Sequence, residues 1–209
     1  EYTIPEPVNF YGDSKWQADK GVRALADERF HVAVLRPPMI YGRGSKGNYP
    51  VLAKLAEKLP VFPDVENQRS MLYIGNLCEF LCKLMLSGEG GIYFPQNEEY
   101  TKTSEMVKEI AEAAGKKIWI TKLMNLTVVI GSHMPEKVSG LVNKAFGNSV
   151  YSQKLSRYTG LDYQNVSLKD SIKTEGEGAD AAANFNCTDS KGTKERSVHI
   201  LVVSQYFYP

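Results

Sequence analysis

The chain has 209 residues, which is enough for one well-formed hydrophobic core or for one domain with part of another. Its 43% hydrophobic and 23% charged residues are usual for a globular protein. A net charge of +1, with no basic tract or acidic tail, gives no indication of nucleic acid as a main ligand. The longest apolar run, Leu126 to Gly131, is too short to cross a bilayer, and the first residues have no signal-peptide pattern. We therefore expect a cytoplasmic protein with no membrane span.

The three cysteines do not suggest a disulfide framework. Cys78 and Cys82 fall four residues apart on an apolar helix face, and no nearby His or Cys completes a set of metal ligands. We therefore expect reduced thiols in the core rather than a metal site.

The first predicted element is a helix over residues 6–28, because Pro7 suits a first turn and apolar residues then recur with a helical period. Tyr11 and Lys15 are four residues apart and so lie on one face of this helix. A free tyrosine has a pKa of about 10, and a neighbouring cation favours the phenolate and lowers that pKa. The two residues form a candidate proton-transfer pair, although the same spacing is also common on solvated helices without such a role.

A buried parallel strand is predicted from His31 to Arg36, where Pro37 and Pro38 end it. The glycine-rich run that follows, residues 42–47, formally matches G-x-G-x-x-G. A dinucleotide fingerprint places its first glycine directly after a strand and opens a helix within the motif, whereas here other residues intervene on both sides. We favour a basic loop beside a ligand, which could present N–H groups and Lys46 to phosphate, over a true dinucleotide loop.

Apolar runs and amphipathic segments alternate from Pro50 to Thr174. Predicted helices cover residues 50–59, 76–86, 103–114, 153–158 and 167–174, and a helical region over 122–146 is interrupted near 131–135. Predicted strands lie at the end of residues 67–74 and over 91–94, 118–120 and 149–151.

The composition changes after Glu175. Residues 176–197 are rich in small and polar residues, with Phe185 as their one aromatic residue, and are predicted to be a linker. Residues 198–209 begin with an intensely apolar strand, which in a parallel sheet needs neighbours on both sides. Two alternatives stay open: the strand completes the sheet of residues 1–175, or it opens a truncated second domain. For the second, the last ten residues resemble the first strand of nucleotide-sugar-dependent glycosyltransferases.

Five motifs, in their order and spacing, resemble the extended short-chain dehydrogenase/reductase family, and within it the NAD-dependent nucleotide-sugar epimerases and dehydratases. They are Tyr11-Gly12-x-Ser14-Lys15, Leu35-Arg36-Pro37-Pro38-x-Ile40-Tyr41-Gly42, Lys46-Gly47-Asn48, Asn67-x-Arg69-Ser70 and Asn76-Leu77. The resemblance covers residues 1–175 and corresponds to the second half of such an enzyme. It implies an α/β fold, namely the C-terminal part of a doubly wound, NAD(P)-binding Rossmann-like domain with the small substrate-binding subdomain.

The resemblance also implies roles for four residues at the cofactor. Tyr11 would be the catalytic acid/base, and Lys15 would hold the nicotinamide ribose and lower the pKa of Tyr11. Pro37 and Pro38 would lie near the nicotinamide. The implied cofactor is NAD, with NADP as an open alternative.

Two further residues are implied in substrate binding. Asn48 would open a helix beside the nucleotide sugar, and Arg69 would pair with the diphosphate, for which a guanidinium offers planar paired donors. The alternative for Arg69 is a surface ion pair with Asp64 or Glu66. Many epimerases have an asparagine in the loop after the strand that ends at Arg36, and its absence here puts one substrate contact in doubt.

The implied function is that of a UDP-sugar 4-epimerase-like enzyme of polysaccharide precursor synthesis, with hydride transfer at C4 of the sugar. A dehydratase and a 4-keto reductase are alternatives, because the residues that distinguish these reactions would precede Glu1. The cofactor loop would also precede Glu1, so we expect this chain alone to be inactive. An alternative of another class is a non-catalytic binding or scaffold fragment. The expected partner is a UDP-sugar, with a homodimer expected for the complete enzyme and no nucleic acid.

Overall fold

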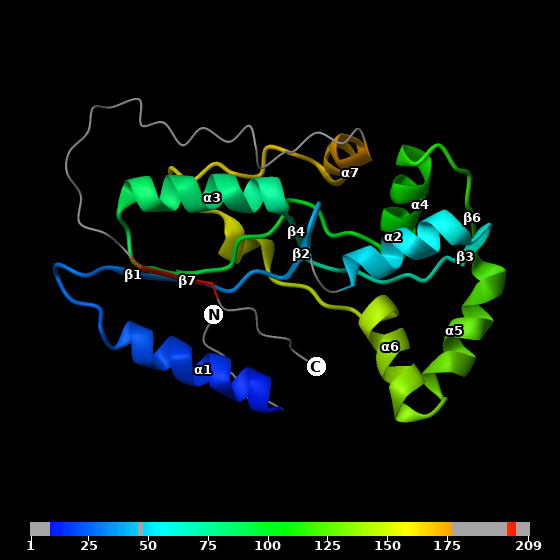
Figure 1. Cartoon of the computed structure of the whole chain (residues 1–209), viewed down its shortest axis with the longest axis horizontal. Coiled ribbons are helices and arrows are strands. Elements are labelled where there is room, and N and C mark those ends of the chain that lie inside the picture. The colour runs from blue at the N-terminus through cyan, green and yellow to red at the C-terminus, as the bar shows by residue number, and fades with distance from the viewer. Residues whose placement is uncertain (1–8, 46–47, 177–199, 204–209) are drawn as a thin grey trace.

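The structure, a computed structural model, describes residues 9–45, 48–176 and 200–203 (Figure 1). The predicted linker therefore lies outside the described residues except for Gly176, and only four residues of the predicted final segment, 200–203, are described.

A parallel sheet of three strands stands at one end of the molecule, in the order β5-β1-β7. Its central strand, β1 (Val32–Leu35), is buried along its whole length, as its unbroken apolar sequence predicts. It pairs on one side with β5 (Gly91–Tyr93) and on the other with β7 (Ile200–Val203). Helices α1 (Phe10–Arg23) and α3 (Ile74–Ser87) lie on opposite sides of these strands in Figure 1, as in an α/β layer structure.

Two short parallel pairs of strands continue the structure toward its other end. They are β2 (Met39–Tyr41) with β4 (Met71–Tyr73), and β3 (Val61–Pro63) with β6 (Trp119–Thr121). The helices of this part are α2 (Tyr49–Lys58), α4 (Thr103–Ala113), α5 (Asn125–Ser132), α6 (Glu136–Phe146) and α7 (Leu168–Gly176), with 3-10 turns η1 (Lys122–Met124) and η2 (Gln153–Ser156).

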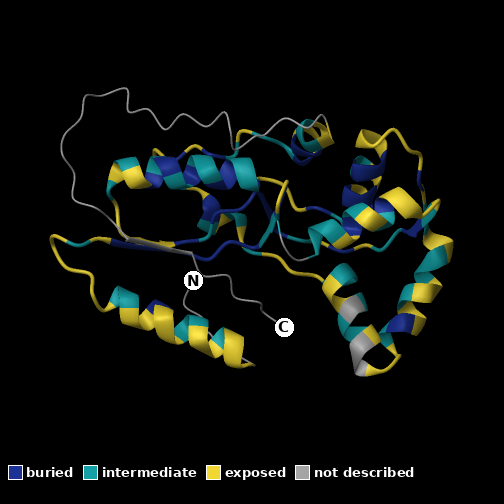
Figure 2. Cartoon of the chain, viewed as in Figure 1, coloured by how far each residue is buried: buried dark blue, intermediate teal, exposed yellow. Residues whose placement is uncertain are grey.

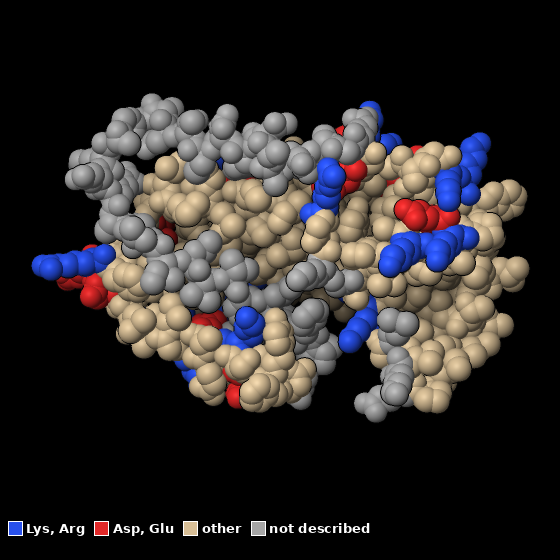
Figure 3. Space-filling view, viewed as in Figure 1, with Lys and Arg blue, Asp and Glu red and all other residues tan. Residues whose placement is uncertain are grey.

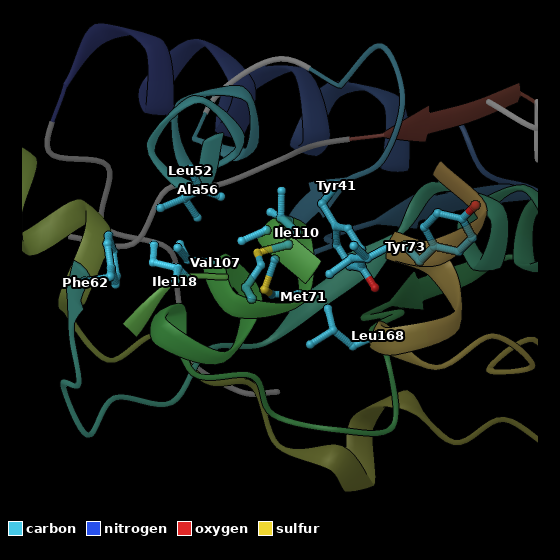
Figure 4. Packing of buried hydrophobic residues seen from close by; sticks show 13 residues of the cluster. Tyr41, Leu52, Ala56, Phe62, Met71, Tyr73, Val107, Ile110, Ile118 and Leu168 are labelled. Atoms are coloured by element: carbon cyan, nitrogen blue, oxygen red, sulfur yellow. The ribbon is translucent and has the colours of Figure 1, made fainter. Parts of the chain in front are cut away.

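Two clusters of buried side chains hold the elements together (Figure 2). The larger joins α2, α4 and α7 to the β2–β4 pair, and its members Met71, Val107 and Leu168 are shown close together in Figure 4. In the smaller cluster, beneath α3, Phe80 meets Tyr163 edge to face with 4.9 Å between ring centroids. Aromatic rings packed in this way stabilise beyond their buried area.

The first helix is shorter than predicted, since within the described residues it covers Phe10–Arg23. Asn9 caps it by accepting a hydrogen bond from the N–H of Gly12 at 2.8 Å. Beyond its end, the carboxylate of Asp27 accepts from the N–H groups of Arg29 and Phe30, at 2.7 Å each. This local turn competes with continuation of the helix. The helix therefore ends before residue 28, where the apolar pattern predicted its end.

Some short elements also differ from the prediction. Strands β2 and β3 were not predicted, because three residues bounded by proline or glycine carry little periodic signal. The strand predicted over 149–151 is reduced to a bridge between Ser149 and Arg69, and the helix predicted over 153–158 to the turn η2.

Ile200–Val203 lie parallel to β1, with Val202 opposite Val34. This is the arrangement expected if the final strand completes the sheet of residues 1–175. Whether residues 198–209 also begin another domain stays a prediction.

Cys78, on α3, is a free thiol as predicted, and burial raises its pKa. Within the described ranges, no helix is long and apolar enough to cross a membrane.

Candidate active site

Tyr11 and Lys15 lie together on the first turns of α1, as their spacing predicts. The ammonium Nζ of Lys15 is 5.6 Å from the centre of the Tyr11 ring, which is within cation–π range. The side chain of Tyr11 is 50% exposed. The phenol is therefore accessible to a ligand while its ring is in contact with a cation.

A buried ion pair fixes α1 against the sheet. Asp19, which is fully buried, accepts from Nη2 of Arg36 at 2.8 Å and from Nε of Arg36 at 3.3 Å. Arg23, one turn further along α1, also pairs with Asp19. The guanidinium of Arg36 lies 5.7 Å from the Trp16 ring and 5.9 Å from the Phe94 ring. Sequence reasoning missed this contact, because Asp19 lies beside the predicted apolar face of the helix and not on it.

Pro37 and Pro38 follow the carboxyl end of β1, and Tyr11 lies on the first turn of α1. These prolines are buried and directly follow Arg36, whose N–H extends the sheet by bonding to the carbonyl of Tyr93 at 2.8 Å. Because α1 runs antiparallel to β1, the first turn of α1 lies toward the carboxyl end of the strand (Figure 1). That edge of a parallel sheet is where α/β proteins bind ligands. The implied cofactor residues thus fit a nicotinamide group by their position at this edge.

The glycine-rich loop begins directly at the end of β2, which is closer to the dinucleotide pattern than the sequence indicated. Gly42 has φ of 129°, and a methyl group in place of its hydrogen would lie 2.5 Å from Cγ2 of Ile74. The next helix, α2, begins at Tyr49 and not within the motif. The Oγ of Ser45 is buried and has no hydrogen-bond partner among the described residues. An orphaned hydroxyl in this loop fits the expectation of a loop beside a polar ligand.

Asn48 and Arg69 meet at the carboxyl end of α6. Asn48 precedes α2, and its Nδ2 is 3.5 Å from the carbonyl oxygen of Lys144. Arg69 donates from Nη1 to the same oxygen at 2.7 Å and to the carbonyl of Gly147 at 3.3 Å. A cation at the end of a helix is favoured by the helix dipole. The structure therefore brings the two implied substrate residues together.

The alternative of a surface ion pair for Arg69 is wrong within the described residues. Glu66 pairs with Lys102 at 2.6 Å, and the carboxylate of Asp64 accepts from Ser104 at 3.3 Å. Arg69 is partly buried, which lowers its pKa from the usual value, and a guanidinium stays charged under such a shift.

Other motif residues act within the protein. Asn67 bonds through both ends of its amide to Thr103 at the start of α4, at 2.9 and 3.0 Å. Asn76, buried at the start of α3, donates to Asn97 at 3.1 Å and to the carbonyl of Val166 at 3.0 Å. These bonds satisfy buried polar groups and hold the segment between β3 and β4 that carries Arg69.

The two groups of implied site residues stand apart in the molecule. Figure 1 shows α1 on one side of the central strands, and α2 and α6 nearer the other end, with the first turn of α1 directed toward α6. Arg36, Pro37 and Pro38, followed by β2, connect the two groups along the chain.

Comparison with known proteins finds a similarity to one family over the first part of the chain. Residues 1–94 match the NAD dependent epimerase/dehydratase family. The resemblance drawn from the motifs is confirmed. A UDP-glucose 4-epimerase of Vibrio cholerae is 34% identical over 119 residues, which are 54% of this chain and 36% of that protein. An N-acetyl-α-D-glucosaminyl-diphospho-ditrans,octacis-undecaprenol 4-epimerase of Escherichia coli O157:H7 is 27% identical over 169 residues, 77% of this chain and 51% of that protein.

The fold is also that of solved epimerases and reductases. The structure of dTDP-4-dehydrorhamnose reductase from Bacillus anthracis in complex with NADP aligns with a TM-score of 0.60 at 20% identity. The alignment covers 85% of this chain and 58% of that one. The predicted α/β, Rossmann-like fold is thereby confirmed. The chain spans about half or less of the length of the curated relatives it matches, 36% and 51%.

Proposed function

We propose that this chain forms the catalytic-helix and substrate-binding part of a nicotinamide-dependent sugar 4-epimerase that acts on nucleotide sugars. The observation that carries the proposal is the Tyr11–Lys15 pair, held accessible at the carboxyl edge of the sheet in a segment that matches the epimerase/dehydratase family.

Tyr11 would carry the proton of the sugar hydroxyl. As phenolate it takes the proton from the O4 hydroxyl when C4 is oxidised, and as phenol it returns the proton when the 4-keto sugar is reduced. Lys15, whose Nζ lies 5.6 Å from the centre of the Tyr11 ring, would orient the cofactor ribose. A bound nicotinamide cofactor supplies the acceptor and then the donor of the hydride. Epimerisation would involve no net redox change, since the hydride taken from C4 would be returned to it on the opposite face of the sugar.

Arg69 and Asn48 would hold the diphosphate. Both bonds that Arg69 forms within the described residues start from Nη1, so Nη2 and Nε are available for phosphate oxygens. The orphaned hydroxyl of Ser45 lies in the loop that leads to Asn48 and would add a polar contact. This arrangement binds the diphosphate by position and charge and leaves the choice of sugar to other residues.

A second candidate substrate carries the same diphosphate on a lipid. The Escherichia coli relative, which matches over 77% of this chain, is named for a sugar joined through diphosphate to undecaprenol. The proton transfer and the diphosphate contact would be the same for both substrates. They differ in whether the diphosphate bears a nucleoside or a polyprenyl chain.

Calorimetric titration of the purified chain tests the substrate part of the proposal. We expect UDP-glucose or UDP-N-acetylglucosamine to bind, and Arg69→Ala to weaken binding by about 10- to 100-fold, the value of a charge-assisted phosphate contact. Lys102→Ala is the matched control, because Lys102 is a nearby exposed cation whose partner is Glu66. It should bind as the unaltered chain does. Equal affinity of both variants for the UDP-sugar would show that Arg69 does not contact the diphosphate.

Turnover tests the catalytic part, in a protein that includes these residues and a cofactor domain. Tyr11→Phe should lower kcat by about 10²- to 10⁴-fold, the usual contribution of a positioned acid/base. Full activity of that variant would contradict the assignment of Tyr11 as the acid/base. Absence of binding to both UDP-sugars and NAD by the present chain would instead favour a non-catalytic scaffold. Dehydrated or reduced sugar products would select the dehydratase or reductase alternative.

A further inference from the structure

The backbone around Arg69 is held between two other segments. Arg69 exchanges two backbone hydrogen bonds with Thr101, each of 3.0 Å. On its other side, the carbonyl of Gln68 accepts from the N–H of Ser149 at 2.9 Å, and the N–H of Ser70 donates to the carbonyl of Ser149 at 2.8 Å. The guanidinium itself bonds to the end of α6, directly before this last segment. The segment that carries Ser149 therefore sets where Arg69 lies.

Tyr151 fixes that segment to residues that follow β5. Its N–H donates to Oγ of Ser70, a buried residue, at 2.8 Å. Its carbonyl accepts from Nε2 of Gln96 at 3.3 Å and from the hydroxyl of Tyr100 at 2.7 Å. Its ring meets that of Phe94 edge to face, with 6.2 Å between the ring centroids. Because Gln96 is fully buried, part of the core holds Tyr151 in place.

Phe94 also contacts the residue that anchors α1. The guanidinium of Arg36 lies 5.9 Å from the centre of the Phe94 ring, within cation–π range. The same guanidinium pairs with the carboxylate of Asp19 on α1. Contacts therefore run without a gap from α1 through Arg36 and Phe94 to Tyr151. They join the two groups of implied site residues by a route other than the chain itself.

The surface between these two groups has a charge that suits an anionic ligand. On the face shown in Figure 3, the described residues between α1 and α6 present a basic side chain and no acidic one. A sugar diphosphate bound there would extend from Tyr11 to Arg69. A contact through two nitrogens of a guanidinium depends on position to within about 1 Å. The separation between α1 and Arg69 therefore affects how well such a ligand binds.

We infer that Tyr151 is a positioning residue, which holds Arg69 at a fixed place relative to the helix that carries Tyr11. It acts through its backbone bond to Ser70 and its ring contact with Phe94, without a contact of its own to the substrate. The inference rests on the proposed function, because that function gives Arg69 the diphosphate. Loss of the Tyr151 ring should therefore change the affinity for a sugar diphosphate only through Arg69.

Calorimetric titration of the full chain with UDP-glucose tests the inference. Tyr151→Leu removes the ring contact and should weaken binding by about threefold to tenfold, the range of one aromatic pair. Tyr151→Phe keeps the ring and should bind as the unaltered chain does. Ser70→Ala removes the acceptor of the Tyr151 N–H and should also weaken binding. In a chain that already carries Arg69→Ala, Tyr151→Leu should cause no further loss, because Tyr151 acts through Arg69.

Ile118→Val is the control for lost stability. Ile118 is buried in the larger cluster, of which Tyr151 is not a member, so this change should lower the melting temperature and leave the affinity unchanged. Binding that depends on Arg69 but not on Tyr151 or Ser70 would overturn the inference alone. An equal loss from Tyr151→Leu in the Arg69→Ala chain would do the same. Absence of UDP-glucose binding by the unaltered chain, or unchanged affinity of Arg69→Ala, would overturn the proposed function and the inference with it.

Discussion

Replacing Asp19 with alanine should destabilise the protein more than any other change in α1. The carboxylate is fully buried and carries the negative charge beside Arg36, which is 6% exposed. Removing one partner of a buried pair takes away the opposite charge beside the other, which costs about 3–5 kcal/mol. The Trp16 and Phe94 rings lie within 6 Å of the Arg36 guanidinium and offset part of this cost. We therefore expect the lower value, about 3 kcal/mol, and a melting temperature lower by roughly 6–12 °C.

The assay is urea unfolding followed by circular dichroism, with Arg23→Ala as the matched control. Arg23 pairs with the same carboxylate, but its side chain is 36% exposed, so its loss should cost about 1 kcal/mol or less. If Asp19→Ala lowered the free energy of unfolding no more than Arg23→Ala, the pair with Arg36 would not be the anchor of α1. Replacing both Asp19 and Arg36 with leucine should be less harmful than Asp19→Ala alone, because no buried charge remains.

Fluorescence can show whether α1 itself loosens in the Asp19→Ala variant. The chain has two tryptophans, and Trp119 is 75% exposed, so Trp119→Phe leaves Trp16 as the reporter at little cost. Trp16 is in contact with the guanidinium groups of Arg23 and Arg36, at 5.7 Å each. Loss of this contact should shift its emission to longer wavelength below the unfolding transition. An unchanged spectrum would place the destabilisation elsewhere.

Two further predictions concern the loop and core beside the implied substrate site. Gly42→Ala should lower the free energy of unfolding by about 2–3 kcal/mol in the same assay, because φ is positive and the new methyl group would lie 2.5 Å from Ile74. Gly44→Ala is the control: φ is also positive, at 74°, but no atom lies within 4 Å of the new methyl group, so the cost should be about 1 kcal/mol. Burial raises the pKa of Tyr41 to about 12, against about 10 in the unfolded chain. The folded state thus holds the phenol proton of Tyr41 more tightly than the unfolded chain does. The stability that this difference in pKa contributes is fully present below pH 10 and is lost as pH rises toward 12. Tyr41→Phe should make the free energy of unfolding less dependent on pH across that range, and an unchanged dependence would contradict the buried phenol.

The sequence predicted the elements with strong periodicity and the contacts that depend on local spacing. Helices α3 and α4 begin and end within two residues of their predicted bounds, and Tyr11 and Lys15 meet because four residues make about one helical turn. The break between α5 and α6 also follows from local residues, Gly131 to Pro135. In each of these cases the residues that decide the structure are neighbours in the sequence.

The contacts that the sequence did not predict join residues distant along the chain. Asn48 and Arg69 meet at the carbonyl of Lys144, 96 and 75 residues away, because α6 ends there. Pairing of Asp19 with Arg36 requires the helix to fold back along the strand. Neither contact gives a periodic pattern in the sequence. Every residue has a backbone carbonyl, so the sequence does not mark the one that Asn48 and Arg69 share. An Asp and an Arg that pair in the core also look the same in a sequence as two charged residues on the surface.

One segment links the two halves of the proposed site, and its sequence suits that task. Arg36 fixes α1, and with it Tyr11, to the end of β1, while Asn48 stands at the far end of the same segment beside the end of α6. Between them Pro37 and Pro38 restrict the backbone, and β2 is held by its register with β4. A sugar diphosphate that reaches from Tyr11 to Arg69 needs both groups at a fixed separation. The motif from Leu35 to Gly42 would therefore set this separation, in addition to placing Pro37 and Pro38 near the nicotinamide.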